Sequence, residues 1–399
     1  MQDNTYDYIL CRFGELTTKG KNRKDFINRL LINIKERLKT FSGLTYEKTH
    51  DAIYIHLNGE DYEKVCARLH TVYGLSNYSG AIRCSRDIEE VKKKALLLAS
   101  KRDYQTFKVN ARRSDKNYPL DSDTINRTVA AHILKNSSLK VDVHRPDLMI
   151  YIIVKEDRIY LLDEKVVAIG GYPVGINGKA LIMMSGGIDS PVAASMMMKR
   201  GLKIECLHFA SMPYTSKQAL DKVLALVKKL TAYQSEIKIH IVPFTDLQLA
   251  IYDHTDESYA ITILRRMMYR IADIICNRRH IMTIANGESI GQVASQTPES
   301  LTVIGSCAKH LIIRPLACLD KIEIIDMAKE LDTYETSILP YEDCCTIFSP
   351  KNPVTKPHED KCLYYESKFD YAALIEDCVA NIETITISSD DIDEEDDLF

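Results

Sequence analysis

The sequence predicts a multidomain protein of mixed α/β and α+β class, with a parallel sheet in its second half. Its 399 residues exceed one ordinary domain. The first half mixes strands and helices irregularly, whereas the second alternates short apolar strands with helices. Between them, four glycines and one proline fall within residues 170–179, which indicates a linker. A ligand of the second half should therefore lie beyond the carboxyl ends of its strands.

Shifts in composition divide the chain into five segments. They are an N-terminal unit at 1–59, a second unit at 60–165, a linker at 166–179, a third unit at 180–389 and a tail at 390–399. Seven of the ten tail residues are acidic, which is typical of a disordered, solubilising segment.

The N-terminal unit is predicted to contain a strand, a helix and a strand. Residues 6–13 form a short apolar run, residues 26–38 carry apolar side chains at helical spacing, and residues 54–57 alternate as a strand does. The junction between the first strand and the helix is basic, with four cations within six positions: Lys19, Lys21, Arg23 and Lys24. We interpret this junction as a candidate phosphate contact, with a solvated charge run as the alternative.

The second unit is predicted to be a mixed α+β fold. Its expected elements are helices at 61–74, 87–101 and 125–137, a basic strand at 106–113, and two strands around a turn at 156–157. Arg112 and Arg113, with the lysines at 92–94, suit an RNA-facing surface. The interleaved aromatic residues of an RRM are absent from the sequence.

The third unit opens with a strand, a glycine turn and a helix over residues 180–201, and further strands are expected at 203–209, 237–244 and 281–287. The turn reads Ser185-Gly186-Gly187-Ile188-Asp189-Ser190, and Pro191 suits the first helical turn. Glycines let backbone N–H groups approach an anion, serines add hydroxyl groups, and the helix N-terminus adds positive charge. No lysine follows the glycines, which excludes the Gly-x-x-x-x-Gly-Lys-Ser/Thr loop. The turn therefore predicts a phosphate site, with a ligand-free tight turn as the alternative.

Charge and composition limit the function classes. The first 175 residues hold 30 basic and 23 acidic residues, whereas the remainder holds 22 basic and 33 acidic residues. This asymmetry indicates that the first half binds a polyanion, with ordinary variation between domains as the alternative. No segment has the ~18 apolar residues of a membrane helix or the features of a signal peptide. The eleven cysteines form no Cys-x-x-Cys pair. We therefore expect reduced thiols in a cytoplasmic protein.

The glycine turn resembles the pyrophosphate loop of the ATP pyrophosphatase family, whose members split ATP between the α- and β-phosphates and transfer AMP to a substrate oxygen. Together with the segments at 12–26 and 141–161, it is similar to the ThiI family of tRNA 4-thiouridine synthases over about residues 8–375. The resemblance implies a ferredoxin-like domain and a THUMP domain that grip tRNA, followed by a PP-loop domain. That domain would use ATP to adenylate uridine 8 and replace its O4 with sulfur from a persulfide.

The resemblance also implies an ATP site. Asp189 is expected to be a partner of Mg²⁺ or to orient the reacting oxygen. The segment at 286–297 resembles the family's second ligand loop, and Arg265 is favoured over Arg266 and Arg270 as the phosphate-binding arginine. The other expected ATP-binding residues are Met183, Met184, Ser185, Gly186, Gly187, Ser190, His208, Phe209, Gly287 and Gln296. A lone histidine such as His208 has a core role as its alternative.

Sulfur transfer requires a thiol that holds a persulfide, and the resemblance places the catalytic cysteine at Cys344. Burial of both Cys344 and Cys345 in the core is the alternative. The resolving cysteine, which would form a disulfide with Cys344, could be Cys345, Cys362 or Cys206. The expected donor is a cysteine desulfurase. Longer family members append a rhodanese-like domain, so this chain of 399 residues is expected to be a short form.

Three matters stay open at the level of sequence. The resemblance includes the role in thiamine biosynthesis that some relatives have, and a homodimer is one option for the oligomeric state. A pyrophosphatase that amidates a small metabolite is a competing function, but it has no use for the basic first half. An RNA-binding module with a vestigial nucleotide site is another, and the intact glycine turn argues against it.

Overall fold

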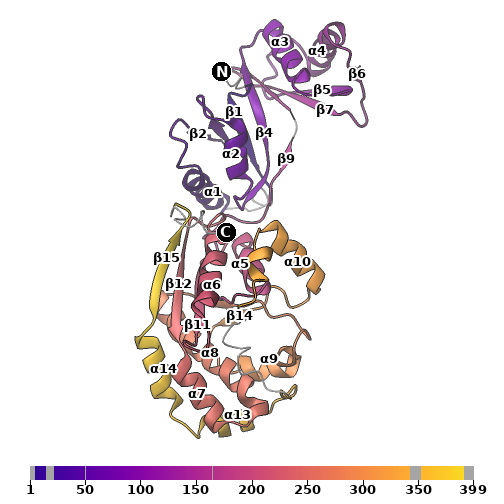
Figure 1. Cartoon of the computed structure of the whole chain (residues 1–399). Helices are drawn as coiled ribbons and strands as arrows, with labels where there is room; N and C mark the ends of the chain where they lie inside the picture. Colours follow the sequence, from indigo (N-terminus) through magenta and orange to yellow (C-terminus); the bar gives the residue numbers. More distant parts are fainter. Residues whose placement is uncertain (1–4, 15–21, 50, 164, 342–351, 391–399) are drawn as a thin grey trace. The chain divides into compact units, whose positions relative to one another are not determined.

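The computed structural model describes residues 5–14, 22–49, 51–163, 165–341 and 352–390. The chain forms two compact units, Met1–Tyr172 and Pro173–Phe399, each of which is described by itself (Figure 1). The division falls within the glycine-rich stretch at 170–179. Among the described helices, none is both long and apolar enough to cross a membrane.

A nine-stranded sheet runs through the described part of the first unit. Its spatial order is β2 (Thr45–Lys48), β3 (Ala52–His56), β1 (Tyr8–Phe13), β4 (Leu75–Cys84), β8 (Ile159–Leu162), β7 (Leu148–Val154), β5 (Thr106–Arg113) and β6 (Lys140–Val141), with β9 (Val166–Val167) beside β4. The sequence analysis did not predict β4, which joins the two halves of the sheet. It pairs with β1 over most of its length and with β8 at its end, where Ala81 faces Leu162.

Three of the described helices of the first unit start at an aspartate that caps them. α2 (Tyr62–Leu69), α3 (Ile88–Ala99) and α4 (Ser122–Asn136) each follow an aspartate whose carboxylate accepts a hydrogen bond from a backbone N–H of the first turn. The cap at Asp121 explains why α4 begins before the predicted position 125. α1 (Arg23–Arg37) buries the apolar stripe that the sequence predicted. Figure 1 shows α3 and α4 beside each other near β5 and β7.

The second unit is built on a six-stranded sheet of described strands. Its order is β14 (Leu311–Ile313), β13 (Thr283–Ala285), β10 (Lys179–Met183), β11 (Lys203–Ala210), β12 (Glu236–Pro243) and β15 (Glu383–Ser388). The neighbours from β14 to β12 pair in parallel, which confirms the predicted parallel sheet. β15 was not predicted, and it pairs antiparallel with β12 at the edge.

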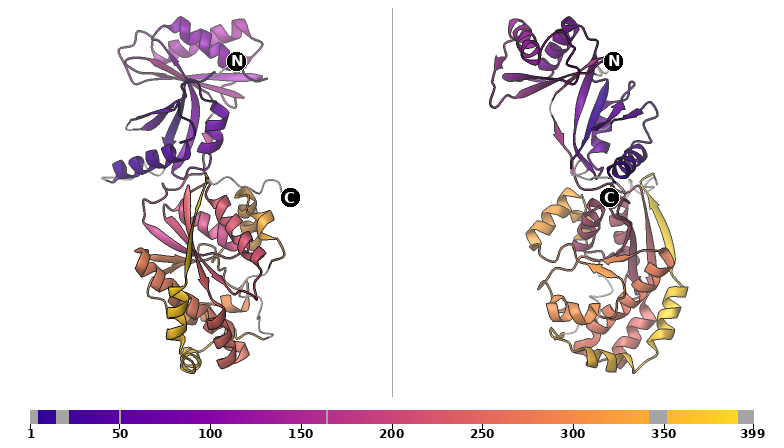
Figure 2. Two further views of the ribbon diagram at one scale, coloured as in Figure 1. Left: turned by 60° about the vertical axis from the view of Figure 1, so that its left-hand side comes forward. Right: turned by 180° about the vertical axis from the view of Figure 1, so that it is seen from behind.

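Helices surround this sheet in the views of Figure 2. They are α5 (Asp189–Lys199), α6 (Lys217–Leu230), α7 (Thr245–His254), α8 (Glu257–Arg279), α9 (Pro298–Gly305), α10 (Lys321–Glu330), α11 (Tyr334–Ser337), α13 (Glu359–Glu366) and α14 (Tyr371–Ala380), with the 3-10 turn η2 (Ala294–Gln296). Buried side chains of α8 pack against strand residues such as Leu181 and Leu207 in the main core cluster. The core therefore fixes α8 against the strands whose carboxyl ends form the site below.

Candidate nucleotide-binding site

A cleft of about 240 Å³ lies at the carboxyl ends of β10, β11 and β13. Its lining residues are Met183, Met184, Ser185, Asp189, Ser190, Leu207, His208, Phe209, Arg265, Met268, Asn286, Gly287, Glu288 and Gln296. Of the residues that the sequence analysis assigns to ATP, only Gly186 and Gly187 are outside this lining, and both belong to the turn between Ser185 and Asp189. The structure thus brings together residues from distant parts of the sequence at the edge where a parallel sheet binds ligands.

Two serines hold the glycine turn in shape. Ser190 Oγ accepts a hydrogen bond from the Ser185 N–H at 3.0 Å and donates one to the Ser185 carbonyl oxygen at 2.9 Å. The Gly187 N–H donates to Ser185 Oγ at 3.3 Å. Because the Ser190 hydroxyl group donates its proton to the Ser185 carbonyl oxygen, Ser190 organises the turn before a ligand binds.

Asp189 begins α5 and contacts the loop at 286–297 and the first residue of α10. Its Oδ1 forms an ion pair with Lys321 Nζ at 2.5 Å, and its Oδ2 accepts a hydrogen bond from Gln292 Nε2 at 3.1 Å. Sequence reasoning did not single out either partner: Gln292 lies within the predicted ligand loop at 286–297, and Lys321 adjoins no predicted strand end. Gly287 packs directly on this residue, because a Cβ at 287 would lie 2.7 Å from the carbonyl carbon of Asp189. Only glycine allows the two ligand loops to come this close.

Glu288 organises the arginines at the cleft. It is 3% exposed, forms an ion pair with Arg265 and receives a hydrogen bond from Arg314 Nε at 2.6 Å. Asn286 Nδ2 donates to the same carboxylate at 2.9 Å. Burial disfavours the charged form, but the guanidinium groups of Arg265 and Arg314 outweigh it and lower the pKa of Glu288. Glu288 therefore holds two positive charges in place as a carboxylate.

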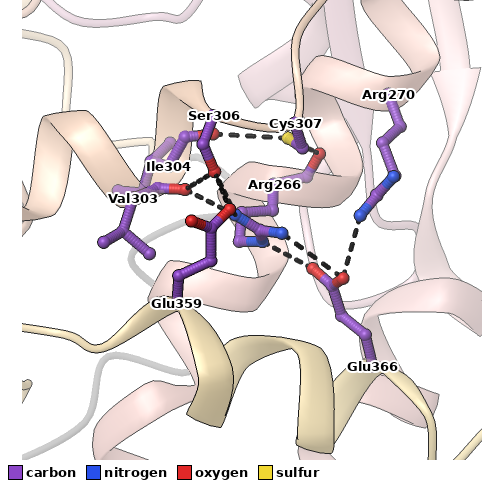
Figure 3. A network of polar contacts seen from close by, with 8 residues as sticks. All are labelled: Arg266, Arg270, Val303, Ile304, Ser306, Cys307, Glu359 and Glu366. Atoms are coloured by element: carbon purple, nitrogen blue, oxygen red, sulfur yellow. Dashed lines mark hydrogen bonds and ion pairs between the residues drawn. The ribbon is translucent and has the colours of Figure 1, made fainter.

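The next arginines of α8 form a separate network, drawn in Figure 3. Arg266 Nε donates to Glu366 Oε1 at 2.5 Å, and Arg270 Nη2 donates to Glu366 Oε2 at 2.8 Å. Arg266 also donates to the carbonyl oxygen of Val303 on α9. Arg265 thus lines the cleft, whereas Arg266 and Arg270 attach α13 to α8.

The remaining predicted side chains have distinct surroundings. His208 Nδ1 lies 3.0 Å from the Met184 carbonyl oxygen, so this histidine also connects β11 to the end of β10. Phe209 packs its ring against Phe244 with 5.0 Å between centroids. Gln296 Oε1 is buried without a hydrogen-bond partner among the described residues. This acceptor is therefore open to a donor from a ligand or from water.

Comparisons with known proteins identify the family. A family model described as thiamine biosynthesis protein (ThiI) matches residues 175–371, a ThiI ferredoxin-like domain matches 8–79, and a THUMP domain matches 85–162. A probable tRNA sulfurtransferase of Geobacillus kaustophilus is 48% identical over 388 residues, which are 96% of this chain and 97% of the relative. The chain belongs to the ThiI family. The family and the fold class predicted from the sequence are both confirmed.

Two further similarities each extend over 96% of the chain. A probable tRNA sulfurtransferase of Bacillus licheniformis is 49% identical over 388 residues, 96% of each chain. A crystal structure of a 4-thiouridine synthetase–RNA complex with bound ATP matches with a TM-score of 0.91 at 36% identity, covering 96% of this chain and 100% of that one. The ferredoxin-like match at 8–79 extends past residue 59, where the sequence analysis ended its first unit.

The basic residues expected to contact RNA in this ThiI protein differ in their surroundings. Lys19 and Lys21 lie outside the described residues. Arg23 is half-buried and Lys24 is exposed at the start of α1. On β5, Arg112 is exposed, whereas Arg113 Nη1 donates to the carbonyl oxygens of Lys116, Tyr118 and Leu120 at 3.3 to 3.5 Å. Arg113 therefore stabilises the turn after β5, and Arg112 has the accessible charge.

The cysteines separate into buried and accessible thiols. Cys344 and Cys345 lie outside the described residues. Burial raises the pKa of Cys206 to about 12 and that of Cys362 to about 11, which makes both poor nucleophiles at neutral pH. Cys318, on the loop before α10, is exposed. The nine described cysteines are all free thiols.

Proposed function

We propose that this protein is an ATP-dependent tRNA sulfurtransferase that adenylates uridine 8 of tRNA and replaces its O4 with sulfur. The observation that carries the proposal is the convergence of the glycine turn, Arg265 and Gln296 in one cleft at the carboxyl edge of the sheet. It is supported by the full-length similarity to a synthetase–RNA complex with bound ATP. ATP is therefore the nucleotide we place in this cleft.

The cleft offers complementary groups for each part of ATP. The glycine turn and the N-terminus of α5 present N–H groups to the phosphates. The guanidinium group of Arg265 adds positive charge beside them. Met183, Met184, His208 and Phe209 supply apolar and backbone surface for the adenosine at the ends of two strands. Gln296 Oε1 can accept a hydrogen bond from the nucleotide or from the substrate edge.

Asp189 fits the expected partner of Mg²⁺. Among the described residues no three His, Cys, Asp or Glu side chains gather into a protein cage for a metal. Mg²⁺ in nucleotide enzymes is commonly held by one or two carboxylates together with substrate phosphates, so one carboxylate at the cleft is a suitable donor set. When bound, the ion neutralises charge on the phosphates. Lys321 shares the same carboxylate and keeps it oriented.

We assign sulfur delivery to Cys344. A cysteine desulfurase passes sulfane sulfur to this thiol as a persulfide. The terminal sulfur of the persulfide attacks C4 of the uridine activated by AMP, and AMP leaves. A second thiol then attacks Cys344 Sγ in the resulting mixed disulfide, which releases 4-thiouridine and leaves a disulfide that a thiol reductant reopens. The reduced thiols of the described residues agree with the cytoplasmic location we propose. Because the matching family model is described as a thiamine biosynthesis protein, sulfur supply to thiamine is the second candidate function.

The first unit is the proposed tRNA grip. Its exposed cations at Lys24 and Arg112 are available for phosphate contacts, which neutral surfaces do not provide. If these contacts hold the tRNA, K24Q and R112Q together should weaken tRNA binding and flatten its salt dependence. We propose a monomer or a homodimer as the active unit, to be decided by light scattering with and without tRNA.

The direct test is mass spectrometry of tRNA incubated with the protein, ATP, Mg²⁺, cysteine and a desulfurase. The proposal predicts an exchange of oxygen for sulfur in uridine 8 that requires ATP and releases AMP. Sulfur incorporation without ATP would contradict the adenylation step. Binding of tRNA with neither AMP release nor sulfur incorporation would contradict the proposal and support the alternative of an RNA-binding module without sulfur chemistry.

A further inference from the structure

Glu288 pairs with two arginines, but only one of them lines the cleft. Arg265 and Glu288 belong to the lining, whereas Arg314 is absent from it. Arg314 directly follows β14, the strand beside β13 in the same sheet, and its Nε donates to Glu288 Oε2 at 2.6 Å. Arg265 pairs with the other oxygen, Oε1. Any influence of Arg314 on a ligand in the cleft therefore passes through Glu288 or through its own charge.

The charges of this group do not cancel. The two guanidinium groups lower the pKa of Glu288 against the opposing effect of burial, so the carboxylate stays ionised at neutral pH. Arginine itself is effectively always protonated in proteins. Two positive charges and one negative charge therefore leave one net positive charge at this side of the cleft. Asp189, the other acidic residue of the lining, has its own cation in Lys321.

The stability of Glu288 does not by itself explain Arg314. Oε2 of this carboxylate also accepts hydrogen bonds from Asn286 Nδ2 at 2.9 Å and from the Tyr269 hydroxyl group at 3.4 Å. Arg314 Nη2 is buried and has no hydrogen-bond partner among the described residues. Because a buried donor without a partner destabilises a fold, the arginine has an unfavourable contribution as well as a favourable one. Departures of this kind from local satisfaction are expected at functional sites.

We propose that Arg314 is a positioning residue for ATP: it neutralises Glu288, so that the neighbouring Arg265 presents an uncompensated positive charge to the phosphates. The inference rests on the ATP site of the proposed function. Without Arg314, Arg265 and Glu288 would form a neutral pair beside the phosphates. Partly buried charges are screened only weakly by salt, so this difference should be measurable at physiological ionic strength.

The test measures the binding of ATP with Mg²⁺, and separately of adenosine, by calorimetry in R314M and R270M. Arg270 is a matched control, because it also shares a buried carboxylate with a second arginine, and its side chain is 25% exposed against 20% for Arg314. We expect R314M to bind ATP about tenfold more weakly, as for one unit charge removed near a partly buried ligand, and uncharged adenosine within about twofold of the parent protein. R270M should match the parent protein with both ligands.

Two further variants separate charge from packing. R314K keeps the positive charge and should bind ATP more tightly than R314M. The double variant E288Q/R314M removes one charge of each sign and again leaves one net positive charge on Arg265. Its ATP affinity should recover to within about threefold of the parent protein, whereas independent packing defects would add and weaken binding further.

The outcomes that contradict the inference are distinct from a failure of the proposed function. ATP affinity of R314M equal to that of the parent protein would overturn the inference, and so would equal weakening for ATP and adenosine. A double variant that binds ATP no better than R314M, or a loss of the same size in R270M, would also overturn it. Absence of ATP binding by the parent protein would instead refute the proposed ATP site.

Discussion

Glu288 and Glu366 are two buried carboxylates that form ion pairs with arginines of the same helix, α8. Glu288 holds Arg265 at the cleft, and Glu366 holds Arg266 and Arg270 against α13. The first network lies among residues that line the cleft, as Gln296 also does, whereas Figure 3 shows the second among helices α8, α9 and α13. Adjacent arginines can therefore have opposite roles, since the direction of each side chain from α8 decides whether it meets a ligand or the scaffold.

The largest expected effect is a loss of unfolding free energy when the Glu366 network is disrupted. R266M removes a guanidinium group that is 1% exposed and leaves Glu366 with Arg270 as its remaining partner. Loss of one partner from a buried ion pair costs about 3–5 kcal/mol of unfolding free energy. Chemical denaturation of the parent and the variant measures this loss. An unfolding free energy within 1 kcal/mol of the parent, roughly the error of such a comparison, would show that the Glu366 network is not structural.

R265M is expected to act on catalysis instead. Removing the cleft arginine should lower kcat/KM for AMP release by about 100-fold, or about 3 kcal/mol, as for other groups that stabilise developing charge. Its unfolding free energy should fall less than that of R266M, because the Arg265 side chain is 16% exposed, whereas that of Arg266 is 1% exposed. Kinetics with varied ATP, paired with denaturation, measures both. The comparison fails if R265M loses stability while keeping its kcat/KM.

G287A should have a smaller effect on the cleft. The added Cβ would meet the Asp189 backbone at 2.7 to 2.9 Å, so the two ligand loops must move apart. We expect ATP to bind about tenfold more weakly, or about 1.4 kcal/mol, by calorimetry. G291A, at a glycine with φ +79° and nothing near its Cβ, controls for backbone strain alone. Equal affinity of G287A and the parent would argue against close contact between the loops.

The smallest expected effect is a pH dependence at a third buried carboxylate. Burial opposes ionisation of Glu205, but His240 and Arg279 outweigh it and lower its pKa to about 2. The group therefore stabilises the fold above its unfolded pKa of about 4.3, and this contribution is lost as the pH falls toward 2. Between pH 5 and pH 4 the loss should be about 0.5 kcal/mol. Denaturation at both pH values measures it, and E205Q should remove this part of the pH dependence; an unchanged dependence in E205Q would contradict the assignment.

The sequence predicted those features of the site that adjoin strand ends. The glycine turn and Gly287 follow the parallel strands β10 and β13, and His208 and Phe209 lie at the end of β11. The carboxyl ends of parallel strands meet at one edge of the sheet. Glu288, Arg314 and Lys321 were missed because their pairing depends on how separate loops fold together. β4 was missed because it is buried on both sides with a glycine in its middle, so it lacks a clear alternation of apolar and polar residues. Arg113 carried the expected charge, but local carbonyl oxygens bind it.

The most direct test of the central claim separates adenylation from sulfur delivery in one reaction. C344S is incubated with tRNA, ATP, Mg²⁺, cysteine and a desulfurase, and both AMP and 4-thiouridine are quantified beside the parent protein. The account predicts AMP release with no 4-thiouridine, because the cleft is intact and the sulfur carrier is missing. Formation of 4-thiouridine by C344S at the parent rate would contradict it.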